Sequence, residues 1–474
     1  MAEIIKRNKP LVVSPLKTSQ PLGASLAVLG LNRALPLMHG AQGCTAFAKV
    51  LLVRHFREPI PLQTTALDSI SSIMGADDNL MAGLCTVCEK HRPAAVGLLT
   101  TGLTETQGTD IVRGLKLFRD RYPEFRAVGI LPINTPDFTG GLESGFAAAV
   151  KTMIEEWVPA AAVAGTHPGR RPRQINVLCG SALTPGDLEA LRETIERFGL
   201  HPLLIPDLSE SLDGHLSAED FSPLTTGGTP LSAFATLGDA AATLVIGDSL
   251  HAAAVLLHER TGVPTHTLPH LFGLAANDHL VMTLAGIAGQ PVPAPLARQR
   301  AQLLDTMLDT HFLLGQARVA IAAEADLLHG FSQLLAELGA DVVAAVTPTS
   351  ASNLARIPVP QIHIGDLEDL ETLAGERNAE LLIGNSHAVE VAQRLELPLL
   401  RAGLPLYDQF GGYQRTWIGY RGARQALFDL ANALLAQADH AVAPYPSFYS
   451  RKADSPQETR HGATPASAHS DWRH

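Results

Sequence analysis

Cysteine is scarce in this sequence, with only four among 474 residues. So few cysteines in so long a chain do not form the disulfide framework that is typical of small secreted proteins. The first ten residues, MAEIIKRNKP, carry charges but are not followed by the apolar core of a secretory signal. We therefore expect a protein of the reducing cytoplasm.

Long apolar runs and an excess of positive charge are also missing. The longest apolar segments, such as the one near 157–165, are rich in alanine and interrupted by proline. None approaches the ~20 residues that are needed to span a bilayer. The formal net charge is −11, without basic runs, which argues against binding to a polyanion. We expect no membrane segment and no nucleic-acid partner.

Familiar nucleotide-binding and hydrolytic motifs are absent as well. The glycine-rich segments GSALTPGD, TTGGTP and DQFGGYQ match neither GxGxxG nor GxxxxGK[ST], and turns at strand ends account for them. No GxSxG or HExxH sequence occurs. His266 and His270 are four residues apart, but the prolines around them prevent a helical metal-binding face. The sequence gives no reason to expect nucleotide binding, hydrolysis or zinc.

What the sequence does contain is a repeated alternation of apolar strand-like runs and helical segments. Hydrophobic residues make up 46% of the chain, as in a well-packed globular protein. Such alternation predicts parallel sheets with helices on both faces. The expected strands are 95–100, 127–132, 175–179, 201–205, 243–246, 318–322, 341–346, 361–364, 381–383 and 397–401. Helices are expected over 187–198, 296–314 and 415–435, and a further helix is expected from a cap at Asp77 or Asp78 to about His91.

The length of the chain indicates about three domains. Connectors rich in small residues and proline divide it into an N-terminal α/β domain at 1–170, a second at 171–290 and a third, with closing helices, at 291–443. The predicted fold class is therefore α/β, with three Rossmann-like doubly wound parallel-sheet domains. The polar tail at 444–474 is low in aliphatic residues, and we expect it to be disordered.

The stretch with the clearest chemical potential is 39–59, HGAQGCTAFAKVLLVRHFREP. Gly40 and Gly43 lead into Cys44 where a loop becomes an apolar helix. A helix start offers free N–H groups and a positive dipole end, which favour a thiolate. On chemistry alone, a lone cysteine after glycine is more often a packed thiol than a metal ligand.

The surrounding residues resemble a known family. QGCTAF…RHFREP, with SPLKTSQPLGA before it and LLTTGLTETQGTD after it, is similar to the β-type chains of the nitrogenase component-1 family. In the catalytic β subunit of that family each of these segments carries one cysteine of a large iron–sulfur cluster. Here only Cys44 remains, and Ser19 and Gly102 stand at the other two positions. This pattern resembles the family's cofactor-assembly scaffold more than its enzyme, and the similarity extends over roughly 10–440.

The resemblance implies a specific role for this region. Cys44 would be one ligand of a [4Fe–4S] cluster shared with a partner subunit that supplies three cysteines, while Gly40, Gln42 and Gly43 would shape the loop. The partner, a NifE-type subunit in an α2β2 heterotetramer, would hold most of the iron–molybdenum cofactor precursor. The nitrogenase reductase, an iron protein, would bind transiently. The chain would have no catalytic cycle of its own.

Several alternatives remain open at this stage. Cys44, Cys85, Cys88 and Cys179 could hold a cluster within this chain, because a cubane usually takes four thiolates. Against this, Cys85 and Cys88 share an apolar helical stripe with leucine and methionine, and Cys179 ends an apolar strand, as buried structural cysteines do. His39 could either pack or lie close to the cluster. Glu105 and Asp110 could line a cavity or cap the next helix.

Two other function classes also fit parts of the sequence. One is a catalytic β subunit of a nitrogenase or of a nitrogenase-like reductase. The other is a cluster-free multidomain binding protein in which Cys44 is buried. Iron and sulfide analysis with the partner present would identify the cluster-free class, and activity assays would separate a scaffold from an enzyme.

Overall fold

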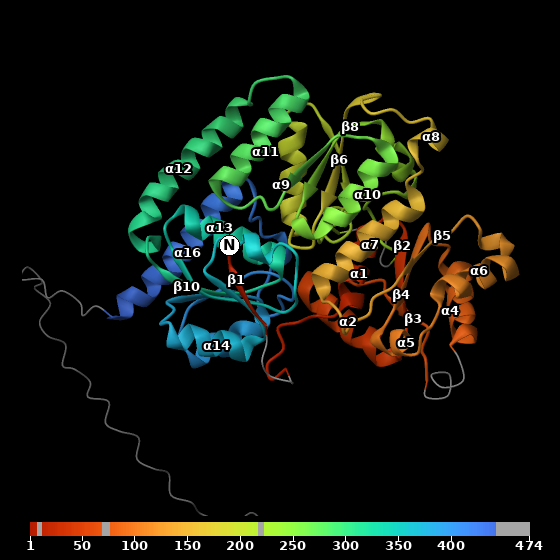
Figure 1. Cartoon of the computed structure of the whole chain (residues 1–474), viewed down its shortest axis with the longest axis horizontal. Helices are drawn as coiled ribbons and strands as arrows, with labels where there is room; N and C mark the ends of the chain where they lie inside the picture. Colours follow the sequence, from red (N-terminus) through yellow and green to blue (C-terminus); the bar gives the residue numbers. More distant parts are fainter. Residues whose placement is uncertain (7–11, 69–75, 217–221, 442–474) are drawn as a thin grey trace, which may run out of the picture.

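The computed structural model describes residues 1–6, 12–68, 76–216 and 222–441. Within them the strands form three sheets in which all pairs are parallel. Figure 1 shows the three sheets in separate lobes, each with helices packed around it. The expected α/β fold with three Rossmann-like parallel sheets is confirmed.

The first sheet has the order β3-β2-β4-β5 and the second the order β7-β6-β8-β9. The first consists of β2 (Ala34–His39), β3 (Gln63–Thr64), β4 (Ala95–Thr100) and β5 (Gly129–Ile133). The second consists of β6 (Arg171–Cys179), β7 (His201–Ile205), β8 (Ala240–Ile246) and β9 (Thr265–Leu268). Their central strands β4 and β8 are almost wholly buried apolar runs, as expected of strands covered on both faces.

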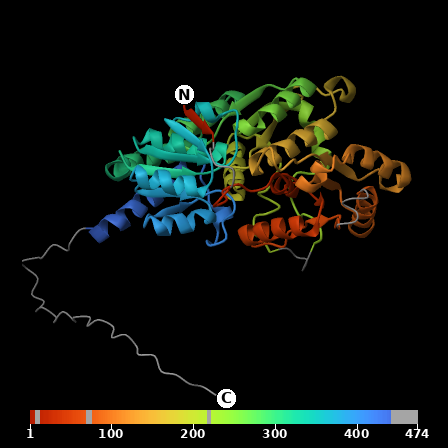
Figure 2. The same cartoon turned by 60° about the horizontal axis from the view of Figure 1, so that its bottom comes forward.

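The third sheet has the order β1-β12-β11-β10-β13-β14. Its strands are β1 (Glu3–Lys6), β10 (Arg318–Ala322), β11 (Asp341–Thr347), β12 (Gln361–Ile364), β13 (Leu381–Gly384) and β14 (Leu399–Arg401). The red strand β1 lies in the lobe of the blue-green strands in both views (Figures 1 and 2). The expected range 1–170 for the first domain therefore does not fit these first residues, since their strand completes the third sheet.

Helices connect the strands and cover the sheets. The first lobe contains α1 (Gln20–Leu29), α2 (Gln42–Phe56), α4 (Asp77–His91), α5 (Gly102–Thr106), α6 (Ile111–Arg121), α7 (Leu142–Trp157) and α8 (Ala161–Ala164). The second contains α9 (Pro185–Glu196), α10 (His251–Thr261) and α11 (Gly273–Ala288). The remaining helices are α12 (Ala294–Leu314), α13 (Ala325–Glu337), α14 (Leu367–Glu376), α15 (Val389–Arg394) and α16 (Gly419–Ala441).

The predicted elements agree well with these bounds. Four strands, β4, β7, β10 and β12, have the predicted ends. Helix α4 ends at His91 as predicted, but its cap residue is Ala76 rather than Asp77 or Asp78, which lie in its first turn. The closing helix α16 begins at Gly419, four residues after its expected start. The expected disorder at 444–474 concerns residues outside those that the structure describes. No helix in the described ranges is long and apolar enough to cross a membrane.

Candidate cluster-binding site

Cys44 lies in the first turn of α2, directly after the carboxyl end of β2. The residue before the helix, Ala41, has an extended backbone and provides no side-chain cap, so this end of the helix keeps N–H groups that its own side chains do not satisfy. The Cys44 side chain is exposed. A thiolate at this position would benefit from the positive end of the helix dipole.

The structure brings together the three positions that the family resemblance singled out. Ser19, Cys44 and Gly102 all line one cavity of about 540 Å³. They come from the start of α1, the start of α2 and the start of α5. The rest of the lining is mostly apolar and is made by Pro15, Lys17, Thr18, Pro21, Leu22, Met38, Gly43, Phe47, Ala48, Leu51, Thr101, Asp137 and His387. One soft thiolate in a largely apolar cavity is the kind of donor that iron–sulfur clusters take.

The two positions without cysteine differ in their local role. Ser19 is the N-cap of α1, and its hydroxyl oxygen accepts a hydrogen bond from the Leu22 N–H at 3.3 Å. Gly102 has open space, because a Cβ added there would meet only the Cβ of Asp137, at 3.8 Å. The missing third thiolate is therefore not a result of crowding.

The residues expected to shape the Cys44 loop have different surroundings. A Cβ at Gly40 would lie 2.5 Å from the Thr101 hydroxyl oxygen, so only glycine allows this close approach of the loop to α5. Gly43 has no neighbouring atom within 4 Å of such a Cβ. Gln42 is exposed at the first position of α2. The structure thus gives a steric reason for Gly40 and none for Gly43.

His39 lies beside the cavity rather than in its lining. Its Nδ1 is 2.9 Å from the Thr65 hydroxyl oxygen, and its Nε2 has no partner among the described residues. Burial lowers the pKa of His39 to about 4, although Asp77 acts in the opposite direction, so the ring is neutral at pH 7. This environment favours packing over contact with a cluster.

The two acidic residues after β4 also lie outside the cavity lining. Asp110 is the N-cap of α6, where its Oδ1 accepts a hydrogen bond from the Arg113 N–H at 2.9 Å. The carboxylate of Glu105 accepts a hydrogen bond from the Thr100 hydroxyl. The capping role expected for this loop is confirmed for Asp110, while Glu105 stabilises the end of β4.

The four cysteines do not form one site. Cys88 is buried in the core between the first sheet and α4, and Cys85 is half-buried on the same helix. Cys179 ends β6 in another lobe, where it too is buried. Burial raises the pKa of the Cys88 thiol to about 11 and also raises that of Cys179, so both stay protonated at neutral pH. The hypothesis of a cluster held within this chain is wrong for this structure.

The cavity also contains residues that sequence reasoning did not single out. The Lys17 ammonium donates a hydrogen bond to the Asp137 carbonyl oxygen, and the Gln20 N–H donates one to the Asp137 carboxylate at 2.8 Å. Asp137 lies in the loop INTPDFTGG that follows β5. Asp137 follows a parallel strand and lies at the sheet edge where ligands usually bind, and this position could have identified it from the sequence.

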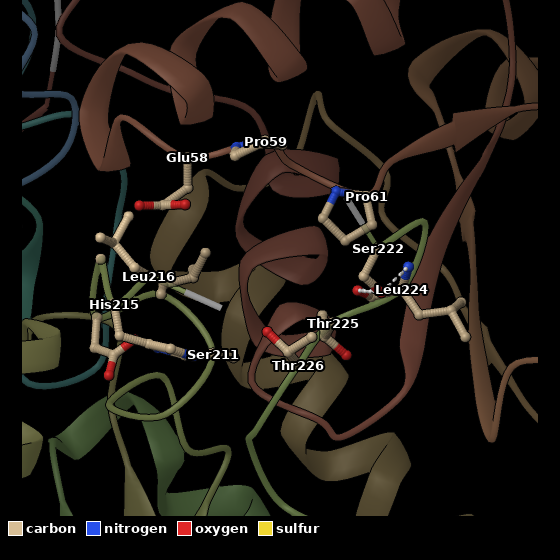
Figure 3. A pocket seen from close by; sticks show the side chains of 13 residues that line it. Glu58, Pro59, Pro61, Ser211, His215, Leu216, Ser222, Leu224, Thr225 and Thr226 are labelled. Carbon is tan, nitrogen blue, oxygen red and sulfur yellow. Dashed lines mark hydrogen bonds and ion pairs between the residues drawn. The ribbon is translucent and has the colours of Figure 1, made fainter. Parts of the chain in front are cut away.

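A second large cavity, of about 350 Å³, is shown in Figure 3. Glu58, Ser211 and His215 lie along its wall, and the Asp213 carboxylate raises the pKa of His215 through a hydrogen bond. None of the residues predicted to bind a cofactor lines it. Its lining includes Leu216 and Ser222, between which the structure leaves residues 217–221 undescribed, so we assign it no role.

Comparison with known proteins shows to which family this chain belongs. Residues 19–435 match the sequence model of the family described as nitrogenase component 1 type oxidoreductase. The chain belongs to this family. Within the nitrogenase component 1 family it is 48% identical over 447 residues to the nitrogenase iron-molybdenum cofactor biosynthesis protein NifN of Klebsiella pneumoniae, covering 94% of this chain and 96% of that protein. The NifN protein of Bradyrhizobium diazoefficiens is 42% identical over 461 residues, with 97% of each chain covered.

Solved structures of the family support the same fold. A chain of the structure titled "Nitrogenase Cp1 at pH 6.5" superposes with a TM-score of 0.85 at 27% identity, covering 92% of this chain and 96% of the other. The agreement over nearly the whole length shows that the three sheets are arranged as in nitrogenase component 1.

Proposed function

We propose that this chain is the N-type subunit of a NifEN scaffold, on which the precursor of the nitrogenase iron–molybdenum cofactor is matured in the cytoplasm. The observation that carries the proposal is the cavity shared by Ser19, Cys44 and Gly102. A single thiolate in place of three suits a smaller cluster than the one in the catalytic β subunit. The names of the relatives, which are cofactor biosynthesis proteins, support the same conclusion.

Cys44 would hold one iron of a [4Fe–4S] cluster, with the other three ligands supplied by a NifE-type partner. A cubane takes four thiolates, and Cys44 is the one exposed thiol of the four in this chain. Next to it on α2, Phe47 and Val50 are 70% and 53% exposed. Apolar side chains of this kind beside an exposed thiol suit a surface that a partner subunit covers.

The other partners follow from the scaffold role. The cofactor precursor would be held mainly by the partner subunit, in an α2β2 heterotetramer, and the nitrogenase reductase would bind transiently. The chain itself would have no independent activity. The alternative of a catalytic β subunit requires thiolates at positions where this chain has a serine hydroxyl and a glycine hydrogen.

The test is the variant Cys44→Ala in a complex purified anaerobically with its partner. Removal of one of four thiolates should open or weaken the cubane, so iron content and the electron paramagnetic resonance (EPR) signal should fall while the tetramer persists. Cys88→Val is the matched control, because Cys88 is buried in the same lobe and should cost on the order of 1 kcal/mol of stability but no iron. Unchanged iron and EPR in Cys44→Ala would refute the assignment.

A further inference from the structure

The helix that carries Cys44 is held very unequally at its two ends. Over the first turns of α2, residues 42–44 are exposed and the helix start has no side-chain cap. In the last turn, His55 and Phe56 are buried. The thiol is therefore at the weakly held end, and the anchor of the helix lies at the opposite end.

That anchor is a loop of the third lobe, residues 403–414. The Leu406 N–H donates a hydrogen bond to the Nδ1 of His55 at 2.9 Å, in a buried setting. The ring of Phe56 lies 6.0 Å from that of Tyr413. On the exposed side, the Arg57 guanidinium donates to the Tyr407 carbonyl oxygen at 2.9 Å.

The same loop is tied firmly to its own sheet. The Tyr407 N–H donates to the hydroxyl of Ser386, which follows β13, at 2.9 Å. The Asp408 carboxylate accepts a hydrogen bond from Ser386 and pairs with Arg401 of β14 at 2.7 Å. These hydrogen bonds fix the loop to the third sheet. We therefore expect α2, which the loop contacts, to keep its position relative to that sheet.

The loop also contacts a residue that lines the cavity. The Tyr407 ring lies 5.8 Å from the ring of His387, and His387 lines the cavity that contains Cys44. The Arg54 guanidinium of α2 lies 4.3 Å above the Tyr407 ring. One tyrosine of the third lobe thus contacts both the helix and a wall residue of the cavity.

We propose that loop 403–414 sets the position of α2, and through it the position of the Cys44 thiolate, with His55 as the positioning residue. A helix transmits a displacement along its axis because its backbone hydrogen bonds make it stiff, and Cys44 lies about 16 Å from His55 at 1.5 Å per residue. The part that concerns the cluster rests on the proposed function, whereas the coupling between loop and helix does not.

The chemistry of His55 suits this role. The ring is buried, and burial lowers the pKa of His55 to about 4. The ring is therefore neutral at pH 7, and its unprotonated Nδ1 accepts from the Leu406 N–H. An asparagine side-chain oxygen can take the place of Nδ1, but a leucine cannot accept a hydrogen bond.

The test compares His55→Leu with His55→Asn in the full complex, using hydrogen–deuterium exchange and EPR. His55→Leu should raise the amide exchange of residues 46–56, whose N–H groups are bonded within α2, by about tenfold, because a helix end that has lost its anchor opens more often. It should also shift the EPR line shape of the cluster at unchanged iron content. His55→Asn should restore both readouts. Gln409→Ala is the matched control, since Gln409 belongs to the same loop but makes none of the contacts to α2 described above.

Two outcomes would overturn the proposal. One is wild-type exchange and EPR in His55→Leu, and the other is failure of His55→Asn to restore either readout. Should His55→Leu fold poorly, Arg54→Ala with Arg57→Ala removes only exposed contacts, those to Tyr407 and Phe410, and should likewise raise the exchange of α2 and shift the EPR line shape. The exchange measurement does not depend on iron, so it tests the coupling between loop and helix even in a complex without a cluster. Absence of a cluster at Cys44 would refute the proposed function but not this coupling.

Discussion

At the scale of single residues, the carboxyl group of Glu324 lies in a cluster of acidic groups with Asp326 and Glu143. Glu324 precedes α13 and is half-buried, and its Oε2 atom, which is itself buried, has no hydrogen-bond partner among the described residues. Burial raises the pKa of Glu324 to about 7, against the attraction of Lys17. Burial likewise raises the pKa of Asp326 to about 6 and that of Glu143, whose carboxylate accepts from the Asp326 N–H at 2.9 Å.

These groups make stability depend on pH in a defined direction. A carboxyl whose pKa is raised in the folded state binds its proton more tightly there than in the unfolded state. For Glu324, the contribution of proton binding to the free energy of unfolding is complete below about pH 4.5 and is lost as the pH rises through about 7. Protons therefore favour the folded state over this window.

We predict that Glu324→Gln reduces this pH dependence. Since glutamine stays neutral, the free energy of unfolding should fall less between pH 5 and pH 8 than in the unmodified chain, by on the order of 1–3 kcal/mol. Urea unfolding at several pH values would measure the difference. Glu376→Gln, at an exposed position of α14, is the control and should leave the slope unchanged. Identical slopes for Glu324→Gln and the control would contradict the prediction.

At the scale of elements, the crossing of α1 and α7 fixes one side of the cavity. The two helices approach so closely that a Cβ at Gly23 would lie 1.9 Å from the Leu142 carbonyl oxygen. A Cβ at Gly145 would lie 2.1 Å from the Gln20 carbonyl oxygen. Because α1 begins at the Ser19 cap, this contact between backbones also determines where Ser19 meets the cavity.

We predict that Gly23→Ala destabilises the chain by at least about 3 kcal/mol, because rigid backbone must move to make room for the methyl group. Gly286→Ala is the matched control, since Gly286 lies in helix α11 with no atom within 4 Å of an added Cβ. That change should stabilise by about 0.5–1 kcal/mol through helix propensity. Thermal or urea unfolding of both variants would measure the effects, and similar stability of the two would show that α1 and α7 can separate at little cost.

At the scale of the whole molecule, the proposed function implies that the number of thiolates around the cavity sets the size of the cluster at the interface with the partner. Gly102 has room for a side chain, and Ser19 has a small hydroxyl group at the N-cap of α1. A serine oxygen is a harder ligand than a thiolate and iron accepts it less readily. The unmodified complex should therefore show a four-iron signature and no meaningful dinitrogen reduction.

We predict that Ser19→Cys combined with Gly102→Cys raises the iron content at the interface of the complex. Iron analysis and EPR of the anaerobically purified protein would measure it. The Ser19 change should also weaken the cap of α1 at a cost of about 1 kcal/mol, for which Ser19→Ala alone is the control. An eight-iron cluster in the unmodified protein, or unchanged iron in the double variant, would contradict the dependence on ligand number.

The elements of the fold could largely be predicted from the sequence because their signals are local. Buried parallel strands such as β4 and β10 are short apolar runs between turn residues, and they have the predicted ends. Strand β2 was missed although all its residues are buried, since it contains Pro36, a residue uncommon in central strands. The role of Cys44 was suggested by a pattern of three segments, which is also readable along the chain.

The sequence by itself therefore determined the α/β architecture, because strand and helix signals depend on residues that are neighbours in the chain, and its resemblance to a known family singled out Cys44. Only the tertiary structure decided that β1 joins the third sheet, paired with residues more than 350 positions away. It also decided that Ser19, Cys44 and Gly102 share a cavity and that Leu406 anchors the Cys44 helix through His55. Contacts of this kind form when separate lobes pack together, and no local periodicity or propensity encodes them.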